Sequence, residues 1–140
     1  MAYYYAKLND DNVVTGVFAV DAKELLDPEG NEVESKGAKF LSDIHGEGKW
    51  LRTCKETRGG IHRSGGTPLR GNFCGKGWLY DPSLDVFHQR QPFPSWTLNG
   101  TTGTWVSPVP YPEVEIIEGE MPPRFSWNED DQKWDEVEMP

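Results

Sequence analysis

Apolar and aromatic residues occur in short runs along this chain, separated by turn-forming residues. Residues 3–8 and 13–20 are rich in aromatic and β-branched side chains, and they flank the cluster Asn9-Asp10-Asp11-Asn12. Two such runs on either side of an Asn/Asp cluster predict a β-hairpin. Residues 49–57 alternate loosely between apolar and polar positions and predict a further strand that carries Trp50.

Three later segments share one spacing: a large apolar residue, then Asp or Asn, then five residues, then a second large apolar residue. The pairs are Tyr80 and Phe87, Leu98 and Trp105, and Trp127 and Trp134. We expect each segment to be a hairpin with the two large side chains opposite or diagonal on one face, where such a pair contributes about 0.2–1 kcal/mol. The interval between the segments is irregular, which argues against a solenoid.

Residues 35–45 have helical spacing. Ser35 can cap the start of the helix, and Gly46 can end it. Gly37 weakens this prediction, because glycine destabilises a helix interior. The predicted apolar face holds Phe40, Leu41 and Ile44. The expected fold class is all-β or β-rich α+β, with several short antiparallel hairpins and one short helix near residues 35–45.

Pro108, Pro110 and Pro112 enforce an extended backbone, which we interpret as a linker. Beyond it, residues 113–120 alternate apolar residues with glutamates, and residues 125–137 predict a last hairpin. We therefore expect a β-rich core domain over residues 1–112 and a C-terminal acidic arm with a hairpin over residues 113–140.

The composition narrows the choice of partners. Aromatic residues make up 12% of the 140 residues and include six tryptophans, so we expect a small core that depends on large rings. The formal net charge of −9 argues against nucleic acid as a partner. Residues 49–91 nevertheless carry eight basic and three acidic residues, between two acidic ends. This pattern suits either internal neutralisation or head-to-tail packing of copies.

Cys54 and Cys74 lack a C-x-x-C spacing, and we expect both to be reduced. The first residues have no basic and apolar regions of a signal peptide, and no apolar run is long enough to span a membrane. We therefore expect synthesis in the cytoplasm and no membrane as a partner.

The sequence contains no recognisable catalytic motif. A metal site built from His62, His88 and Cys74 is conceivable, but turn or surface histidines are the favoured interpretation, because no zinc-binding spacing is present. The sequence has no nucleophile elbow, P-loop or dinucleotide-binding fingerprint. Its pairs of adjacent aspartates lie in predicted turns, where aspartate is common for backbone reasons. We expect no enzymatic activity, no cofactor and no metal.

The tryptophans have three interpretations: a small core, a protein interface, or a platform that stacks on sugar rings. Arginine and aromatic residues together are the composition of interface hot spots. On this basis, the candidate partner-interface residues are Arg58, His62, Arg63, Arg70, Trp78, Tyr80, Trp96, Trp105 and Tyr111.

Several of these motifs also occur together in a known group of proteins. The segments 59–62, 65–72, 75–81, 92–98 and 105–112, with Tyr4-Tyr5-Ala6-Lys7-Leu8-Asn9 and Phe125-Ser126-Trp127-Asn128, resemble small virion structural proteins. These are encoded by tailed phages of marine cyanobacteria and related ocean bacteria. The resemblance covers most of the chain, and it is the order of the motifs that is specific.

The resemblance implies a non-enzymatic particle component, made in the host cytoplasm and present in the virion in many copies or as a homo-oligomer. Other virion proteins, of the tail or the major capsid, would be its partners. The expected place is the tail or its fibres; the alternatives are a decoration or cement protein on the head shell, and an adsorption module that binds a host surface glycan. A hydrolase has no support beyond scattered carboxylates and histidines.

Overall fold

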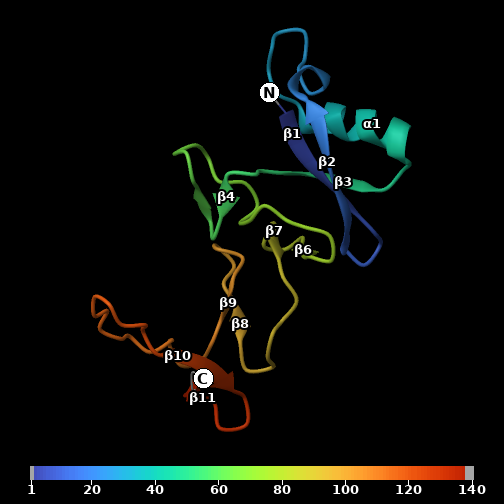
Figure 1. Cartoon of the computed structure of the whole chain (residues 1–140). Coiled ribbons are helices and arrows are strands. Elements are labelled where there is room, and N and C mark those ends of the chain that lie inside the picture. Colours follow the sequence, from blue (N-terminus) through green and yellow to red (C-terminus); the bar gives the residue numbers. More distant parts are fainter. Residues whose placement is uncertain (1, 138–140) are drawn as a thin grey trace. The chain divides into compact units, whose positions relative to one another are not determined.

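The computed structural model describes residues 2–137 and is β-rich, with short antiparallel hairpins and one α-helix among these residues (Figure 1). This confirms the expected fold class. The elements are β1 (Ala2–Leu8), β2 (Val14–Asp21), η1 (Ala22–Glu24), α1 (Glu34–His45), β3 (Lys49–Thr53), β4 (Thr57–Arg58), β5 (Ile61–His62), β6 (Leu79–Asp81), β7 (Val86–His88), β8 (Thr97–Leu98), β9 (Trp105–Val106), β10 (Arg124–Asn128) and β11 (Lys133–Val137).

The described chain forms two compact units. The first contains the residues up to Arg90 together with Gly100–Thr104, and the second contains Gln91–Asn99 and the residues from Trp105 onward. The boundary that the sequence suggests near residue 112 thus falls inside the second unit. The reason is that Trp96, well before that boundary, packs against the rings of Trp127 and Trp134 in the last hairpin.

A three-stranded antiparallel sheet with the order β2-β1-β3 organises the first unit (Figure 1). Successive β1 residues point to opposite faces, so the sheet is buried on both sides. Tyr5 belongs to a core cluster with Leu41 of α1 and Trp50 of β3. Its neighbour Ala6 belongs to a second cluster, on the other face, with Phe87 of β7.

The helix α1 begins one residue before the predicted start. Its N-cap is Val33, which makes no side-chain capping bond, so the prediction that Ser35 caps the helix was wrong: Ser35 already lies in the first turn. Gly46 ends the helix as predicted, with φ at 97° and its N–H donating to the Ser42 carbonyl at 2.9 Å. Of the predicted apolar face, Leu41 is buried and Ile44 is 58% exposed.

The shared spacing predicted the later hairpins correctly. In each one the two large residues are directly paired across the strands: Tyr80 with Phe87, Leu98 with Trp105, and Trp127 with Trp134. The N-terminal hairpin of β1 and β2 is also confirmed.

Strand β3 is shorter than the predicted 49–57, because the Thr57 N–H donates to the Cys54 carbonyl at 3.0 Å and turns the chain. A hairpin of β4 and β5 follows, which the sequence suggested only as a glycine-rich turn. Gly59 and Gly60 form its two-residue loop with φ values of 57° and 77°. Two successive positive φ values are what a type I′ turn requires, and glycine adopts them without strain.

Candidate protein-interaction surfaces

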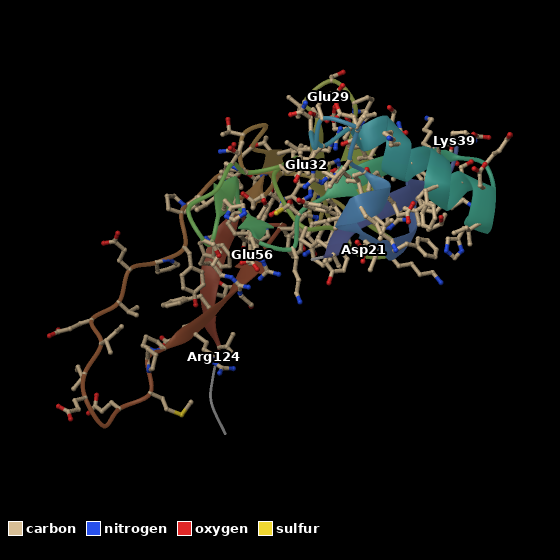
Figure 2. The ribbon with its side chains drawn as sticks, turned by 90° about the horizontal axis from the view of Figure 1, so that it is seen from above. Asp21, Glu29, Glu32, Lys39, Glu56 and Arg124 are labelled. Atoms are coloured by element: carbon tan, nitrogen blue, oxygen red, sulfur yellow. The ribbon has the colours of Figure 1, made fainter. Side chains whose placement is uncertain are left out.

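The first unit contains a groove of about 780 Å³ between the start of β1, the end of β3 and the loop that follows β5. Two of its lining carboxylates, Glu32 and Glu56, are labelled in Figure 2. The lining side chains that matter below are those of Tyr3, Glu32, Arg52, Cys54, Lys55 and Glu56, and we call this surface the groove.

One wall of the groove is a fixed cluster of three side chains. The Arg52 guanidinium lies 4.0 Å from the centre of the Tyr3 ring, and it donates to Glu32 Oε2 at 2.9 Å. The Tyr3 hydroxyl donates to the other oxygen of the same carboxylate. These bonds, first from Tyr3 and then from Arg52, lower the pKa of Glu32. The bond to Glu32 and burial raise the pKa of Tyr3. The wall therefore presents an aromatic face beside a neutralised ion pair.

The other wall contains Glu56 and the turn that follows β5. Arg63 donates to Glu56 Oε2 at 2.9 Å, which lowers the pKa of Glu56 and raises the pKa of Arg63. His62 Nδ1 accepts from the backbone N–H groups of Ser64 and Gly66 at 3.2 and 3.0 Å. His62 thus holds the turn, and Arg63 neutralises a carboxylate of its own unit.

The two carboxylates of the groove are held in their ionised form. Both Glu32 and Glu56 have a lowered pKa, so both are ionised at neutral pH. A general acid needs a carboxyl group whose pKa is raised toward the working pH. The carboxylates of the groove are shifted in the opposite direction.

Arg70, a candidate interface residue, is internal, with a side chain only 13% exposed. Its guanidinium bonds both oxygens of Glu34 at 2.7 and 3.2 Å, Asp85 at 2.9 Å and the Arg52 carbonyl at 2.8 Å. Burial by itself would lower the pKa of Arg70, but the bonds to Glu34 and Asp85 outweigh it and raise the pKa. Arg70 joins α1, β3 and the turn before β7 instead of offering its charge to a partner.

Other cations of the basic middle remain unneutralised. Arg52, Arg63 and Arg70 are held by carboxylates of the first unit. Within residues 2–137, no hydrogen bond or ion pair engages the side chains of Lys55, Arg58, Lys76 and Arg90. Lys55 lies in the groove, and Arg58 follows it three positions later, exposed on β4. Internal neutralisation is therefore only partial.

Two further candidates, Trp78 and Tyr80, flank the core of the first unit. Both pack against the cluster that contains Phe87. The Trp78 carbonyl accepts from the Val14 N–H at 2.8 Å, and the Tyr80 hydroxyl donates to Asp85. Both side chains are half-buried and contribute to the packing of the first unit.

The remaining aromatic candidates lie in the second unit, where edge-to-face contacts form a small core. The Trp134 ring centre lies 5.2 Å from that of Trp127, 5.9 Å from Trp96 and 5.0 Å from Tyr111. Trp127 is only 9% exposed. Trp105 is half-buried on β9. Trp96, Trp127 and Trp134 contact one another's rings, which corresponds to the core interpretation for these three tryptophans. Tyr111 packs on the same cluster but is 51% exposed.

Glu129 fixes the loop that carries Trp96 to the last hairpin. Its carboxylate accepts from the Ser95 N–H at 3.0 Å, the Ser95 hydroxyl at 2.9 Å and Trp127 Nε1 at 3.3 Å. These bonds, those from Ser95 first, lower the pKa of Glu129. A turn glutamate that the sequence analysis did not single out is thus a main connection inside the second unit.

The proline segment is packed and does not act as a free linker. The Val109 carbonyl accepts from Trp134 Nε1 at 2.8 Å, and the Tyr111 hydroxyl accepts from the Phe125 N–H at 3.2 Å. The segment that the sequence suggests as a linker is therefore bonded to the last hairpin through Val109 and Tyr111. The free segment begins after it.

Residues 113–121, which we call the acidic loop, have no strand or helix and stand out from the second unit as the orange loop before β10 (Figure 1). Figure 2 shows its side chains directed away from the ribbon on both sides. Ile116 is 81% exposed, Met121 69% and Ile117 50%. The side chains of its four glutamates make no hydrogen bond or ion pair within residues 2–137: Glu113, Glu115, Glu118 and Glu120. Several exposed apolar side chains gathered in one short segment are typical of a contact site.

The structure gives no support to the conceivable metal site. His62 is engaged in its turn, and Cys74 is buried in the core cluster with Phe87. Among residues 2–137, no group of three His, Cys, Asp or Glu side chains is arranged to hold a metal ion. In the same range, no helix is both long and apolar enough to cross a membrane.

Neither the groove nor the acidic loop has a motif that sequence reasoning could have used. The groove is formed by residues from β1, β3 and two loops that are far apart in the sequence. The acidic loop has the composition of an ordinary acidic segment, and only the structure shows that its apolar side chains are exposed. Comparison with models of protein families, with curated proteins and with solved structures found no match to this chain.

Proposed function

We propose that this chain is a non-enzymatic structural protein of a phage particle, present in multiple copies and associated with the tail or its fibres. The observation that carries the proposal is the acidic loop. It leaves Ile116, Ile117 and Met121 in water, although burying one such side chain stabilises a complex by about 1.5–3 kcal/mol. A protein that works by contact with others has a use for such a surface.

The fixed side chains of the groove also support this proposal. Its carboxylates are ionised and committed to Arg52, Tyr3 and Arg63, so they fix its shape. A rigid, mixed aromatic and charged concavity is suited to holding a peptide segment. The particle and its tail enter the proposal through the sequence resemblance.

Immunogold electron microscopy of the intact virus tests the placement. Antibodies against the purified chain should label the tail or its fibres, and peptides of the chain should appear in mass spectra of purified particles. Gold confined to the head would replace the tail assignment with a decoration or cement role. Particles with neither gold nor peptides would refute a virion protein altogether.

A further inference from the structure

The acidic loop needs a partner surface of opposite charge. Its nine residues carry four glutamates and no basic residue, and the glutamate side chains are unpaired within residues 2–137. Ile116, Ile117 and Met121 are exposed between and beside them. The partner must therefore combine apolar surface with cations that are not already neutralised.

The groove of the first unit meets these requirements. Tyr3 and Leu69 give it aromatic and aliphatic lining, and its 780 Å³ accommodates several side chains. Lys55 lies in it, with Arg58 close by in the sequence, and both cations are unpaired within residues 2–137. Arg52 adds no net charge, because Glu32 neutralises it.

We propose that the acidic loop of one copy binds in the groove of a second copy of this chain. Each chain would then offer one loop and one groove, so the contact is head-to-tail and continues into a ring or a filament. The proposal deepens the proposed function and rests on it for the setting, a particle in which many copies lie close together. It also explains why a basic middle stands between acidic ends in a chain of net charge −9.

A single loop in a groove buries less area than a standard interface of about 1,600 Å². We therefore expect a weak contact in solution, with a Kd of roughly 0.1 mM, which crowding on a particle would strengthen by multivalency. The glutamate–lysine pairs should make assembly weaken as salt rises.

Sedimentation velocity of the full chain over a concentration series tests the contact. The loop variant is Ile116→Asp with Ile117→Asp, and the groove variant is Lys55→Glu with Arg58→Glu. All four side chains are exposed or unpaired, so these changes should leave both units folded. Wild type should form species larger than a dimer, and each variant alone should stay monomeric.

Mixing the two variants gives the most specific readout. The loop variant keeps an intact groove and the groove variant keeps an intact loop, so the mixture should form a one-to-one dimer that cannot grow. Matched controls make the same types of substitution outside the loop and the groove, and they should assemble like wild type. They are Ile44→Asp on α1 for the loop variant, and Lys76→Glu with Arg90→Glu for the groove variant.

Cys54 lines the groove and reports its occupancy. Its labelling by a thiol reagent should slow severalfold as wild-type concentration rises, and the loop variant should show no slowing. A wild type that is monomeric at about ten times the expected Kd, or a mixture that forms no dimer, would overturn the inference. So would variants that still assemble.

The two proposals fail separately. Particles that carry the chain, together with a purified chain that does not assemble through loop and groove, would remove the head-to-tail contact only. A chain that assembles as described but is missing from purified particles would leave this contact standing and refute the virion function.

Discussion

Gly37 of α1 lies directly against the ring of Tyr5 in β1. A Cβ atom built on Gly37 would stand 2.4 Å from Tyr5 Oη and 2.7 Å from Cζ, where real Cβ atoms essentially never lie. Tyr5 is fully buried, and its hydroxyl donates to the Glu34 carbonyl at 2.8 Å. The ring therefore cannot move aside without losing a buried hydrogen bond. The glycine that weakens the helix prediction is the residue that lets the helix approach the sheet.

Gly37→Ala should consequently destabilise the protein, although alanine favours a helix by about 1 kcal/mol. Overpacking costs about 1–3 kcal/mol, so after the gain in helix propensity we expect a net loss of up to about 2 kcal/mol in the free energy of unfolding, measured with urea. In a Tyr5→Phe background the hydroxyl oxygen nearest to the new Cβ atom is removed, so the destabilisation by Gly37→Ala should be smaller. A gain in stability on Gly37→Ala would contradict the close contact.

Ser35→Ala is a control from the same helix. Ser35 is exposed and makes no capping bond, so this substitution should change stability by less than about 0.5 kcal/mol. A working N-cap would instead cost about 1 kcal/mol. The pair of measurements separates the close contact from general effects on helix propensity.

Arg70→Ala should cost about 1.5–3 kcal/mol in unfolding free energy, because the buried guanidinium loses its bonds to Glu34, Asp85 and the Arg52 carbonyl. Arg58→Ala is the matched control, since Arg58 is exposed and unpaired within residues 2–137 and should cost less than about 0.5 kcal/mol. Equal effects of the two substitutions on urea midpoints would mean that Arg70 is not an internal connection.

Contacts between residues close in the sequence could be predicted, whereas contacts between distant residues could not. The pairs Tyr80 with Phe87 and Trp127 with Trp134 could be predicted, because a hairpin is set by its own turn and spacing. Arg70 could not be recognised as internal, because its partner Glu34 lies 36 positions away. The proline segment was misjudged for the same reason: its contact with Trp134 spans 25 positions. One wall of the groove also depends on distant contacts, since Tyr3 and Arg52 bond Glu32 across 29 and 20 positions.

Cys74 should make the protein sensitive to alkali. Burial raises the pKa of its thiol to about 11, although a bond with Thr53 opposes this, whereas the thiol of the unfolded chain ionises near 9. As pH rises, the thiol of the unfolded chain therefore loses its proton before the thiol of the folded protein does. The contribution of Cys74 to the free energy of unfolding is complete below about pH 9. It falls as pH rises toward 11, by nearly 3 kcal/mol in all. Urea midpoints from about pH 8 to about pH 11 would measure the slope.

Cys74→Ala should flatten this slope without removing it, because burial also raises the pKa of Tyr5 to about 12. Cys54→Ala is the comparison and should keep the wild-type slope, since its half-exposed thiol lies outside both core clusters. An identical pH dependence in all three proteins would show that Cys74 is not protected in the folded state.

Trp127→Ala should loosen the second unit selectively. Trp127 contacts the rings of both Trp96 and Trp134, and its loss should cost roughly 3–5 kcal/mol, whereas Trp127→Phe keeps a ring and should cost less. Near-ultraviolet circular dichroism would follow the tryptophan cluster, and thiol labelling of the buried Cys74 would follow the first unit. We expect the dichroism signal to melt at a lower temperature while Cys74 stays protected. Coincident melting of both signals would mean that the two compact units unfold as one, since a shared transition lowers both midpoints together.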